Sequence, residues 1–161
     1  MKKTHLLALL LSLVSPVFST VSQADEIRNA AGGKCLDVAG GNPAAGTRII
    51  LWPCHGGPNQ NWTVTKGEIR GLGGKCLDIA GGNPAAGTPI ILWPCHGGPN
   101  QRWTVTKEGQ IRGLGGKCSA TVTGRMPADG TPITLSSCNR EFNQKWSFMK
   151  QSAHEGPTKF D

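Results

Sequence analysis

Short apolar runs alternate with glycine- and proline-rich turns along most of the chain. Ile49-Ile50-Leu51-Trp52 and Trp62-Thr63-Val64-Thr65 are rich in β-branched and aromatic residues, and Gly56-Gly57-Pro58 lies between them. Short runs of this composition, bounded by turn residues, predict β-strands. Apolar residues at helical spacing do not continue beyond about ten residues anywhere in this region. The pattern therefore predicts an all-β fold.

The pattern occurs three times. Residues 34–66 and 75–107 are each 33 residues long and differ at three positions, and a more divergent third version spans 117–150. An Ile-Arg pair precedes each version, at a spacing of 42 residues. Three versions of a four-strand unit favour a closed threefold arrangement, because closure removes the exposed edges of the sheets.

With the Ile-Arg pairs included, the repeat divides a predicted domain of residues 25–150 into three units. We call them copy 1 (26–66), copy 2 (67–107) and copy 3 (108–150). Residues 151–161 follow the last copy and are expected to be a C-terminal tail.

Residues 1–24 have the pattern of a signal peptide. Two lysines precede an apolar stretch from Leu6 to Phe18, and the small residues Ser22 and Ala24 mark a cleavage site. The stretch has 13 residues, whereas a membrane span needs about 20. A buried first helix is the alternative. The sequence thus predicts a secreted or periplasmic protein without a membrane span.

Six cysteines lie in the repeats, two in each copy, and exported proteins use such cysteines in disulfides. Pairing within a copy treats equivalent cysteines equally. The expected pairs are Cys35–Cys54, Cys76–Cys95 and Cys118–Cys138. Zinc is the alternative, but Cys-x-x-Cys is absent and the spacings of 19, 19 and 20 do not suit a tetrahedral ligand set. We expect three disulfides and no metal.

The formal net charge is +7 and the pI is about 9.4, a balance that nucleic-acid-binding proteins share. The repeat, however, distributes Arg28, Arg70 and Arg112 around the molecule, and export argues against such a ligand. We expect no nucleic-acid partner.

Each copy ends in a Gln-x-Trp motif, in register with the cysteine pairs. The motifs are Gln60-Asn61-Trp62, Gln101-Arg102-Trp103 and Gln144-Lys145-Trp146. In copies 1 and 2, Cys-Leu-Asp, a Gly-Thr turn and Leu-Trp-Pro-Cys precede the motif. Together these features resemble the ricin B-chain type lectins, also called R-type lectins or family 13 carbohydrate-binding modules. The resemblance implies a β-trefoil with pseudo-threefold symmetry and one potential sugar site in each of three foils.

By this resemblance, copies 1 and 2 each hold one carbohydrate site. The residues are Asp37, Trp52, His55, Asn59 and Gln60 in copy 1, and Asp78, Trp93, His96, Asn100 and Gln101 in copy 2. The resemblance implies that the aspartate accepts from sugar hydroxyls, the tryptophan stacks on the ring and the asparagine donates. It also implies that the glutamine orients the aspartate from behind, while the histidine matches a sugar contact of some xylan-binding members. An aromatic plate beside a charged acceptor suits a pyranose.

Two departures from the family pattern affect the expected ligand. Some galactose-binding members have a glutamine two residues before the stacking aromatic, where this chain has Ile50 and Ile91, so galactose-type and xylan-type sugars both stay open. In copy 3, Ser119-Ala120-Thr121 replaces the Leu-Asp-Val sequence and Ser136 replaces the stacking tryptophan. We therefore expect two sugar sites, with copy 3 as scaffold. The alternative to a sugar-binding role is that the two aspartates only cap a turn.

Other functions find less support in the sequence. His55-Gly56-Gly57 is similar to a lipase oxyanion motif, but the chain lacks a Gly-x-Ser-x-Gly nucleophile motif. The repeated aspartates are expected in separate foils, too far apart to cleave a glycoside together. We expect no catalytic residue and no cofactor. The remaining alternative is a protein-interaction trefoil, either the binding part of a toxin with a partner subunit or an inhibitor without a free sugar site.

Overall fold

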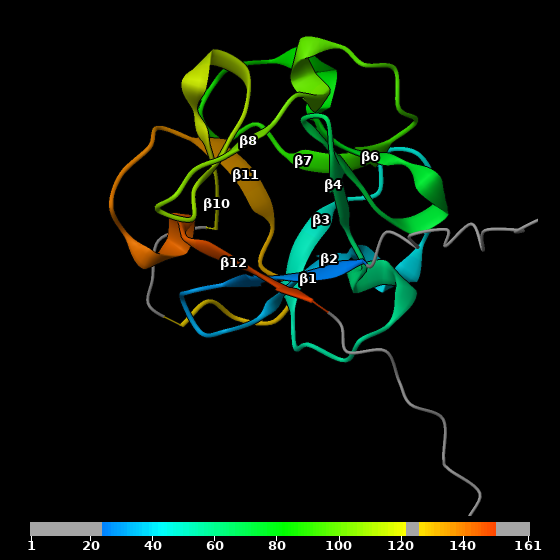
Figure 1. The fold of residues 1–161 in the computed structure, drawn as a ribbon, viewed down its shortest axis with the longest axis vertical. Coiled ribbons are helices and arrows are strands. Elements are labelled where there is room, and N and C mark those ends of the chain that lie inside the picture. Colours follow the sequence, from blue (N-terminus) through cyan, green and yellow to red (C-terminus); the bar gives the residue numbers. More distant parts are fainter. Residues whose placement is uncertain (1–23, 122–125, 151–161) are drawn as a thin grey trace, which may run out of the picture.

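A computed structural model describes residues 24–121 and 126–150, so most of the predicted signal peptide and the whole predicted tail lie outside the described residues. The described chain forms three four-stranded antiparallel sheets arranged around a common centre (Figure 1). The predicted all-β fold is confirmed.

The twelve strands of the described residues fall into these three sheets. The first sheet has the order β12-β1-β2-β3, with β1 at Asp25–Asn29, β2 at Cys35–Val38, β3 at Ile49–Trp52 and β12 at Trp146–Lys150. The second has the order β4-β5-β6-β7, with β4 at Thr63–Thr65, β5 at Glu68–Arg70, β6 at Cys76–Ile79 and β7 at Ile90–Trp93. The third has the order β11-β10-β9-β8, with β8 at Thr104–Val105, β9 at Ile111–Arg112, β10 at Cys118–Thr121 and β11 at Ile133–Ser136.

The helical segments of the described residues are short 3-10 turns in the connections. They are η1 (Ala39–Gly41), η2 (Pro58–Gln60), η3 (Leu72–Gly74), η4 (Ala80–Gly82), η5 (Pro99–Gln101), η6 (Leu114–Gly116) and η7 (Phe142–Gln144). Segments of three residues agree with the lack of helical periodicity in the sequence.

Each sheet combines the last strand of one copy with the first three strands of the next copy. The strand that follows each Gln-x-Trp motif pairs with the Ile-Arg strand of the next copy, as in β4 with β5 and β8 with β9. The third such pair joins the two ends of the repeat array, because β12 pairs with β1 from Asp25 opposite Lys150 to Asn29 opposite Trp146 (Figure 1). This last pair closes the ring.

Near the centre, the third strand of each copy (β3, β7 or β11) meets the Gly-Thr turn of another copy. Gly46 N donates to Leu92 O on β7 at 2.7 Å, and Leu92 N donates to Thr47 O at 2.8 Å. The same two bonds connect the turn of copy 2 to Leu135 on β11, and the turn of copy 3 to Leu51 on β3. The turn needs glycine because φ is +88° at Gly46, in the left-handed region that other residues avoid. The three contacts form a cycle and give the fold its threefold symmetry.

The tryptophans of the Gln-x-Trp motifs lie in the core. Trp62 is fully buried, and Trp103 and Trp146 are 4% exposed. Each indole Nε1 donates to the backbone carbonyl of the residue after the first cysteine of its copy. The bonds are 2.9 Å to Leu36 O, 2.9 Å to Leu77 O and 3.1 Å to Ser119 O. The motif thus anchors the end of one copy to the second strand of the same copy.

The three predicted disulfides are confirmed. They join Cys35 to Cys54, Cys76 to Cys95 and Cys118 to Cys138. Each bridge joins the start of the second strand of a copy to the loop after the third strand of the same copy. In copies 1 and 2, that loop carries the histidine and asparagine of the predicted sugar site.

Candidate functional site

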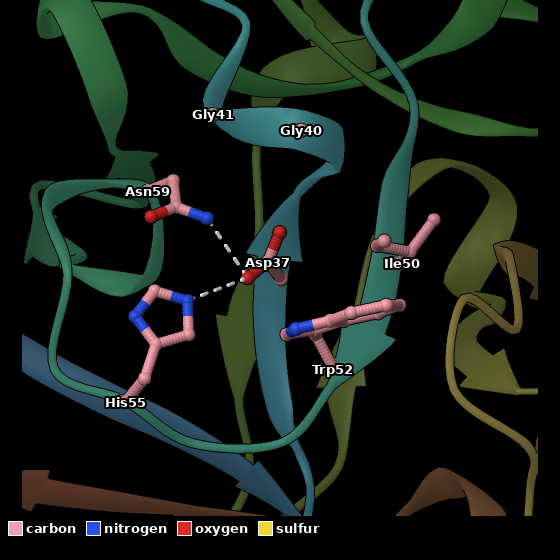
Figure 2. A pocket seen from close by; sticks show the side chains of 7 residues that line it. All are labelled: Asp37, Gly40, Gly41, Ile50, Trp52, His55 and Asn59. Carbon is pink, nitrogen blue, oxygen red and sulfur yellow. Dashed lines mark hydrogen bonds and ion pairs between the residues drawn. The ribbon is translucent and has the colours of Figure 1, made fainter.

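The site residues predicted for copy 1 surround a surface hollow of about 400 Å³ (Figure 2). The hollow is lined by Asp37, Gly40, Gly41, Ile50, Trp52, His55 and Asn59. Strand β2 supplies the aspartate, β3 supplies the isoleucine and the tryptophan, and the loop after β3 supplies the histidine and asparagine. The fifth predicted residue, Gln60, is fully buried beneath the hollow.

Asp37 is the carboxylate of this hollow. It is 2% exposed, and its Oδ2 accepts hydrogen bonds from Asn59 Nδ2 at 2.9 Å and Gln60 Nε2 at 2.8 Å. Within residues 24–121 and 126–150, no hydrogen bond to Oδ1 is formed, and Figure 2 shows this oxygen pointing away from Asn59 and His55. Oδ1 is therefore available to accept a hydrogen bond from a ligand.

Gln60 connects the carboxylate to the loop after β3. Its Nε2 donates to Asp37 and to Pro53 O at 3.0 Å, and its Oε1 accepts from His55 N at 2.8 Å. These contacts use both ends of the amide inside the protein. Any effect of Gln60 on a bound molecule must therefore pass through the carboxylate or through the position of His55.

A turn through Gly57 holds His55 in place. Its Nδ1 accepts from Gly57 N at 3.1 Å, and its Nε2 lies 3.5 Å from Asp37 Oδ2. Because Nδ1 accepts, the proton of the neutral ring is on Nε2 and faces the carboxylate. A Cβ at Gly57 would lie 2.6 Å from His55 Cε1 and 2.9 Å from Asn59 Oδ1, so a side chain there would displace the histidine and asparagine side chains of the site.

Trp52 forms an open aromatic wall. Alternation along β3 buries Ile49 and Leu51 and turns Trp52 outward, where it is 43% exposed. The edge of its ring lies beside the Gly-Thr turn of copy 3, since a Cβ at Gly130 would be 3.9 Å from Trp52 Cζ3. A flat exposed ring next to a buried acceptor can contact the C–H face and a hydroxyl of one molecule at once.

Copy 2 repeats this geometry. Asp78 Oδ2 accepts from Asn100 Nδ2 at 2.9 Å and from Gln101 Nε2 at 2.8 Å, and His96 Nε2 lies 3.5 Å away. Trp93 is 42% exposed. Its ring lies beside the Gly-Thr turn of copy 1, where a Cβ at Gly46 would be 3.8 Å from Cζ3. The two predicted sets thus share these contacts to the aspartate but have different neighbouring copies.

The family model of the ricin-type beta-trefoil lectin domain matches this chain in two stretches, residues 23–73 and 65–157. Together the stretches include all three copies. The chain belongs to the ricin-type β-trefoil lectin family. Its three copies are the foils of a β-trefoil, and the family and fold that the sequence resemblance implied are confirmed.

Solved structures place the lectin domain among R-type lectins. The C-half of an earthworm R-type lectin, in complex with GalNAc, is 26% identical with a TM-score of 0.69, over 80% of this chain and 99% of that one. The agglutinin from Abrus precatorius, 24% identical with a TM-score of 0.70 over 86% of this chain and 51% of its own, has the same fold. So does ThreeFoil, a designed threefold-symmetric protein, which is 24% identical with a TM-score of 0.72 over 80% and 99% of the two chains.

A curated relative matches only a short part of this chain. The probable lipoprotein EnvE of Salmonella typhimurium is 48% identical over 40 residues, which is 25% of this chain and 23% of that protein. The match thus spans less than a quarter of that relative.

Copy 3 of the lectin domain keeps the glutamine and its contacts without the aspartate and the tryptophan of the site. Gln144 Oε1 accepts from Asn139 N at 2.7 Å and its Nε2 donates to Ser137 O at 2.8 Å, as the other two glutamines do in their copies. Alanine occupies the position of Asp37, however, and Ser136 that of Trp52. Copy 3 therefore lacks both the carboxylate and the aromatic wall.

Sequence reasoning missed two parts of the copy-1 hollow. Gly40 and Gly41 were expected only to form a turn, yet they line the hollow, with φ of +63° and +61°. Ile50, expected only as a missing polar contact, is itself a wall. The turn of copy 3 beside Trp52 had no signal in the sequence, because the repeat does not state which copies are neighbours.

Two groups among the described residues place a carboxylate near two sulfurs, Glu26 with Cys35 and Cys54, and Glu68 with Cys76 and Cys95. In both groups the sulfurs form a disulfide, so they cannot act as the thiolate ligands that zinc needs.

In the part of the chain that the structure describes, no helix has the length and apolar character to cross a membrane.

Proposed function

We propose that this lectin domain binds carbohydrate through two sites, one in copy 1 and one in copy 2. The observation that carries the proposal is an exposed tryptophan beside a buried aspartate with one available oxygen, at Trp52 with Asp37 and again at Trp93 with Asp78. The earthworm relative in complex with GalNAc supports it.

The proposed ligand is a pyranose of the galactose or xylan type. Its C–H face stacks on Trp52, and a hydroxyl donates to Asp37 Oδ1 while Asn59 and His55 border the same hollow. Ile50 offers no hydrogen bond, so the sugar presents carbon and hydrogen there rather than a buried hydroxyl. Two sites on one rigid domain raise the apparent affinity for a glycan surface by about 10²-fold or more.

We also propose that residues 1–24 are removed as a signal peptide and that the domain acts outside the cytoplasm, secreted or periplasmic. Three disulfides support this, because they persist in oxidising compartments. Sequencing the N-terminus of the exported protein tests the proposal. The expected first residue is Asp25, and an exported protein that keeps Met1 would contradict it.

Titration calorimetry with methyl galactoside and with xylotriose tests the two sites. One of these sugars should bind with a stoichiometry of two per chain. Trp52→Ala and Trp93→Ala should each remove one site, and the double variant should remove both. Ser136→Ala, at the equivalent position of copy 3, is the matched control and should bind like the wild type. A glycan array without any signal, or unchanged stoichiometry in the double variant, would refute the proposal.

A further inference from the structure

We propose that copy 3 holds a second kind of site, an anion site suited to the sulfate or phosphate ester of a sugar. It is a hollow of about 510 Å³ lined by Glu108, Gln110, Arg112, Cys138, Asn139, Arg140 and Lys145. Of these positions, only that of Asn139 corresponds to a residue lining the copy-1 hollow, namely His55. The anion site is therefore a different place from the proposed carbohydrate sites.

The arginine of the Ile-Arg pair has a different partner in copy 3. In copies 1 and 2, a glutamate two residues earlier neutralises the arginine, with distances of 2.8 Å from Arg28 to Glu26 and 2.7 Å from Arg70 to Glu68. In copy 3 the partner is a neutral amide, because Arg112 Nε and Nη2 donate to Gln110 Oε1 at 3.1 and 2.7 Å. The guanidinium is held in the same way, but the group that holds it carries no charge.

Gln110 also fixes the loop that carries the other cations. Its Nε2 donates to Asn139 O at 2.6 Å, a bond that a glutamate carboxylate could not make. One amide therefore orients Arg112 and anchors the backbone immediately before Arg140.

Two further cations line the hollow, at positions where copy 3 differs from copies 1 and 2. Arg140 replaces the glycine after the histidine, Gly56 or Gly97, whose φ is +70° in both copies. In the described residues, Lys66 is the only non-glycine residue with positive φ, so the loop of copy 3 accepts an arginine without backbone strain. Lys145 stands inside the Gln-x-Trp motif, with Nζ 5.4 Å from the centre of the Phe142 ring.

One carboxylate opposes these three cations. Glu108 lines the hollow, and its pKa is lowered by a hydrogen bond from its own backbone and one from Thr106, with a smaller contribution from Arg112. It therefore stays charged at neutral pH and leaves an excess of two positive charges among the lining residues. Glu141 follows Arg140 in the chain but does not line the hollow.

The charges suit an oxyanion. The planar donor forks of arginine match the oxygens of sulfate and phosphate groups, and lysine adds a compact point charge. A volume of about 510 Å³ lies within the usual range for small-molecule sites, about 300–1,000 Å³, so it admits one sugar with its ester group. A neutral sugar would gain nothing from these cations.

Arg112 also lines a neighbouring hollow of about 650 Å³, together with Arg102 of copy 2. Arg102 Nη1 donates to Lys66 O at 2.8 Å, which holds its guanidinium beside this hollow. The positive surface thus continues across the boundary between copies 2 and 3. It fits a glycan that carries ester groups on successive sugars better than a single isolated ester.

A nuclear magnetic resonance titration of the labelled protein tests the anion site, with glucose 6-sulfate, glucose 6-phosphate and glucose as probes. We expect the backbone amides of Gln110, Arg112 and Arg140 to shift with one or both esters and not with glucose. The shifts should weaken as the salt rises from about 20 to about 150 mM, because exposed charges are screened. The ester that binds more tightly identifies the anion. Equal shifts with glucose, or shifts confined to other residues, would overturn the proposal.

Variants separate this site from the carbohydrate sites. Arg112→Gln with Arg140→Gln should weaken ester binding at least about tenfold, as expected for losing charge-assisted hydrogen bonds. Gln110→Glu, which installs the carboxylate of copies 1 and 2, should act in the same direction. Arg70→Gln is the matched control and should bind the ester like the wild type. Unchanged ester binding in the double variant would overturn the anion site, while neutral-sugar binding, measured separately, should not change in any of these proteins.

Discussion

Replacing Asp37 with asparagine changes the chemistry of the copy-1 site with almost no change in shape. Asn59 and Gln60 both donate to Oδ2. Asparagine can place its carbonyl oxygen there and keep both bonds. Its amide group then takes the place of Oδ1, where it donates instead of accepting. Asp37→Asn therefore removes the acceptor that a sugar hydroxyl needs, while the loop after β3 stays attached.

The expected effects on binding and on stability differ in size. Losing one hydrogen bond to a charged group costs about 1.5–3 kcal/mol, which corresponds to about 10- to 150-fold in the dissociation constant. Both internal bonds to position 37 persist and lose only their charged acceptor, so we expect stability to fall by about 1 kcal/mol. For a domain of this size that is a decrease of about 4 °C in Tm.

Titration calorimetry and thermal unfolding of Asp37→Asn, Asp78→Asn and the double variant measure both effects. Each single variant should keep one site with the affinity of the wild type, which makes the intact site an internal control. The double variant should bind neither site detectably and still unfold cooperatively. If the double variant bound sugar like the wild type, or lost its fold, the aspartates would be supports of the loop and the reasoning would be wrong.

Three further changes test the scaffold. Gln144→Ala removes two partly buried hydrogen bonds and should lower the free energy of unfolding by about 1–3 kcal/mol, measured by denaturant titration, while sugar binding stays unchanged. Gly71→Ala would place a Cβ 2.5 Å from Trp62 Cζ3 and should cost about 1–3 kcal/mol by overpacking; a variant as stable as the wild type would show that the indole can move. Replacing Cys118 and Cys138 by alanine opens a loop of 20 residues and should cost about 3 kcal/mol, and calorimetry should still count two sugar sites if copy 3 is scaffold only.

Much of the fold could be predicted because the same pattern of cysteines, short apolar runs and turn residues occurs three times in the chain. The cysteine pairs follow from their equal positions in the copies. A tryptophan that copy 3 keeps, although it lacks the aspartate and tryptophan of the sugar site, indicates a core role for Trp62, Trp103 and Trp146. Period-two alternation along residues 49–52 directs Trp52 outward from Ile49 and Leu51. These inferences concern residues within one copy, where spacing along the chain is enough.

Contacts between copies could not be predicted in the same way. The pairing of β12 with β1 and the position of Gly130 beside Trp52 depend on which copy lies next to which. Nothing in a periodic sequence specifies that order. The cationic hollow of copy 3 was missed for a related reason. Comparison with copies 1 and 2 showed what copy 3 had lost, whereas Gln110 and Arg140 are 30 positions apart in the sequence and meet only in the folded chain.

The pairing of β1 with β12 also sets the order in which the domain is completed. Each disulfide spans only 19 or 20 residues, so it can form as soon as its own copy has been made. Asp25 and Lys150, in contrast, are separated by 125 residues, and contacts this distant in sequence are slow to form. The edge of β1 stays open until the end of the third copy has emerged. A chain that stops before Trp146 would keep its local bridges and the pairing of β1 with β2, but the other edge of β1 would have no partner strand.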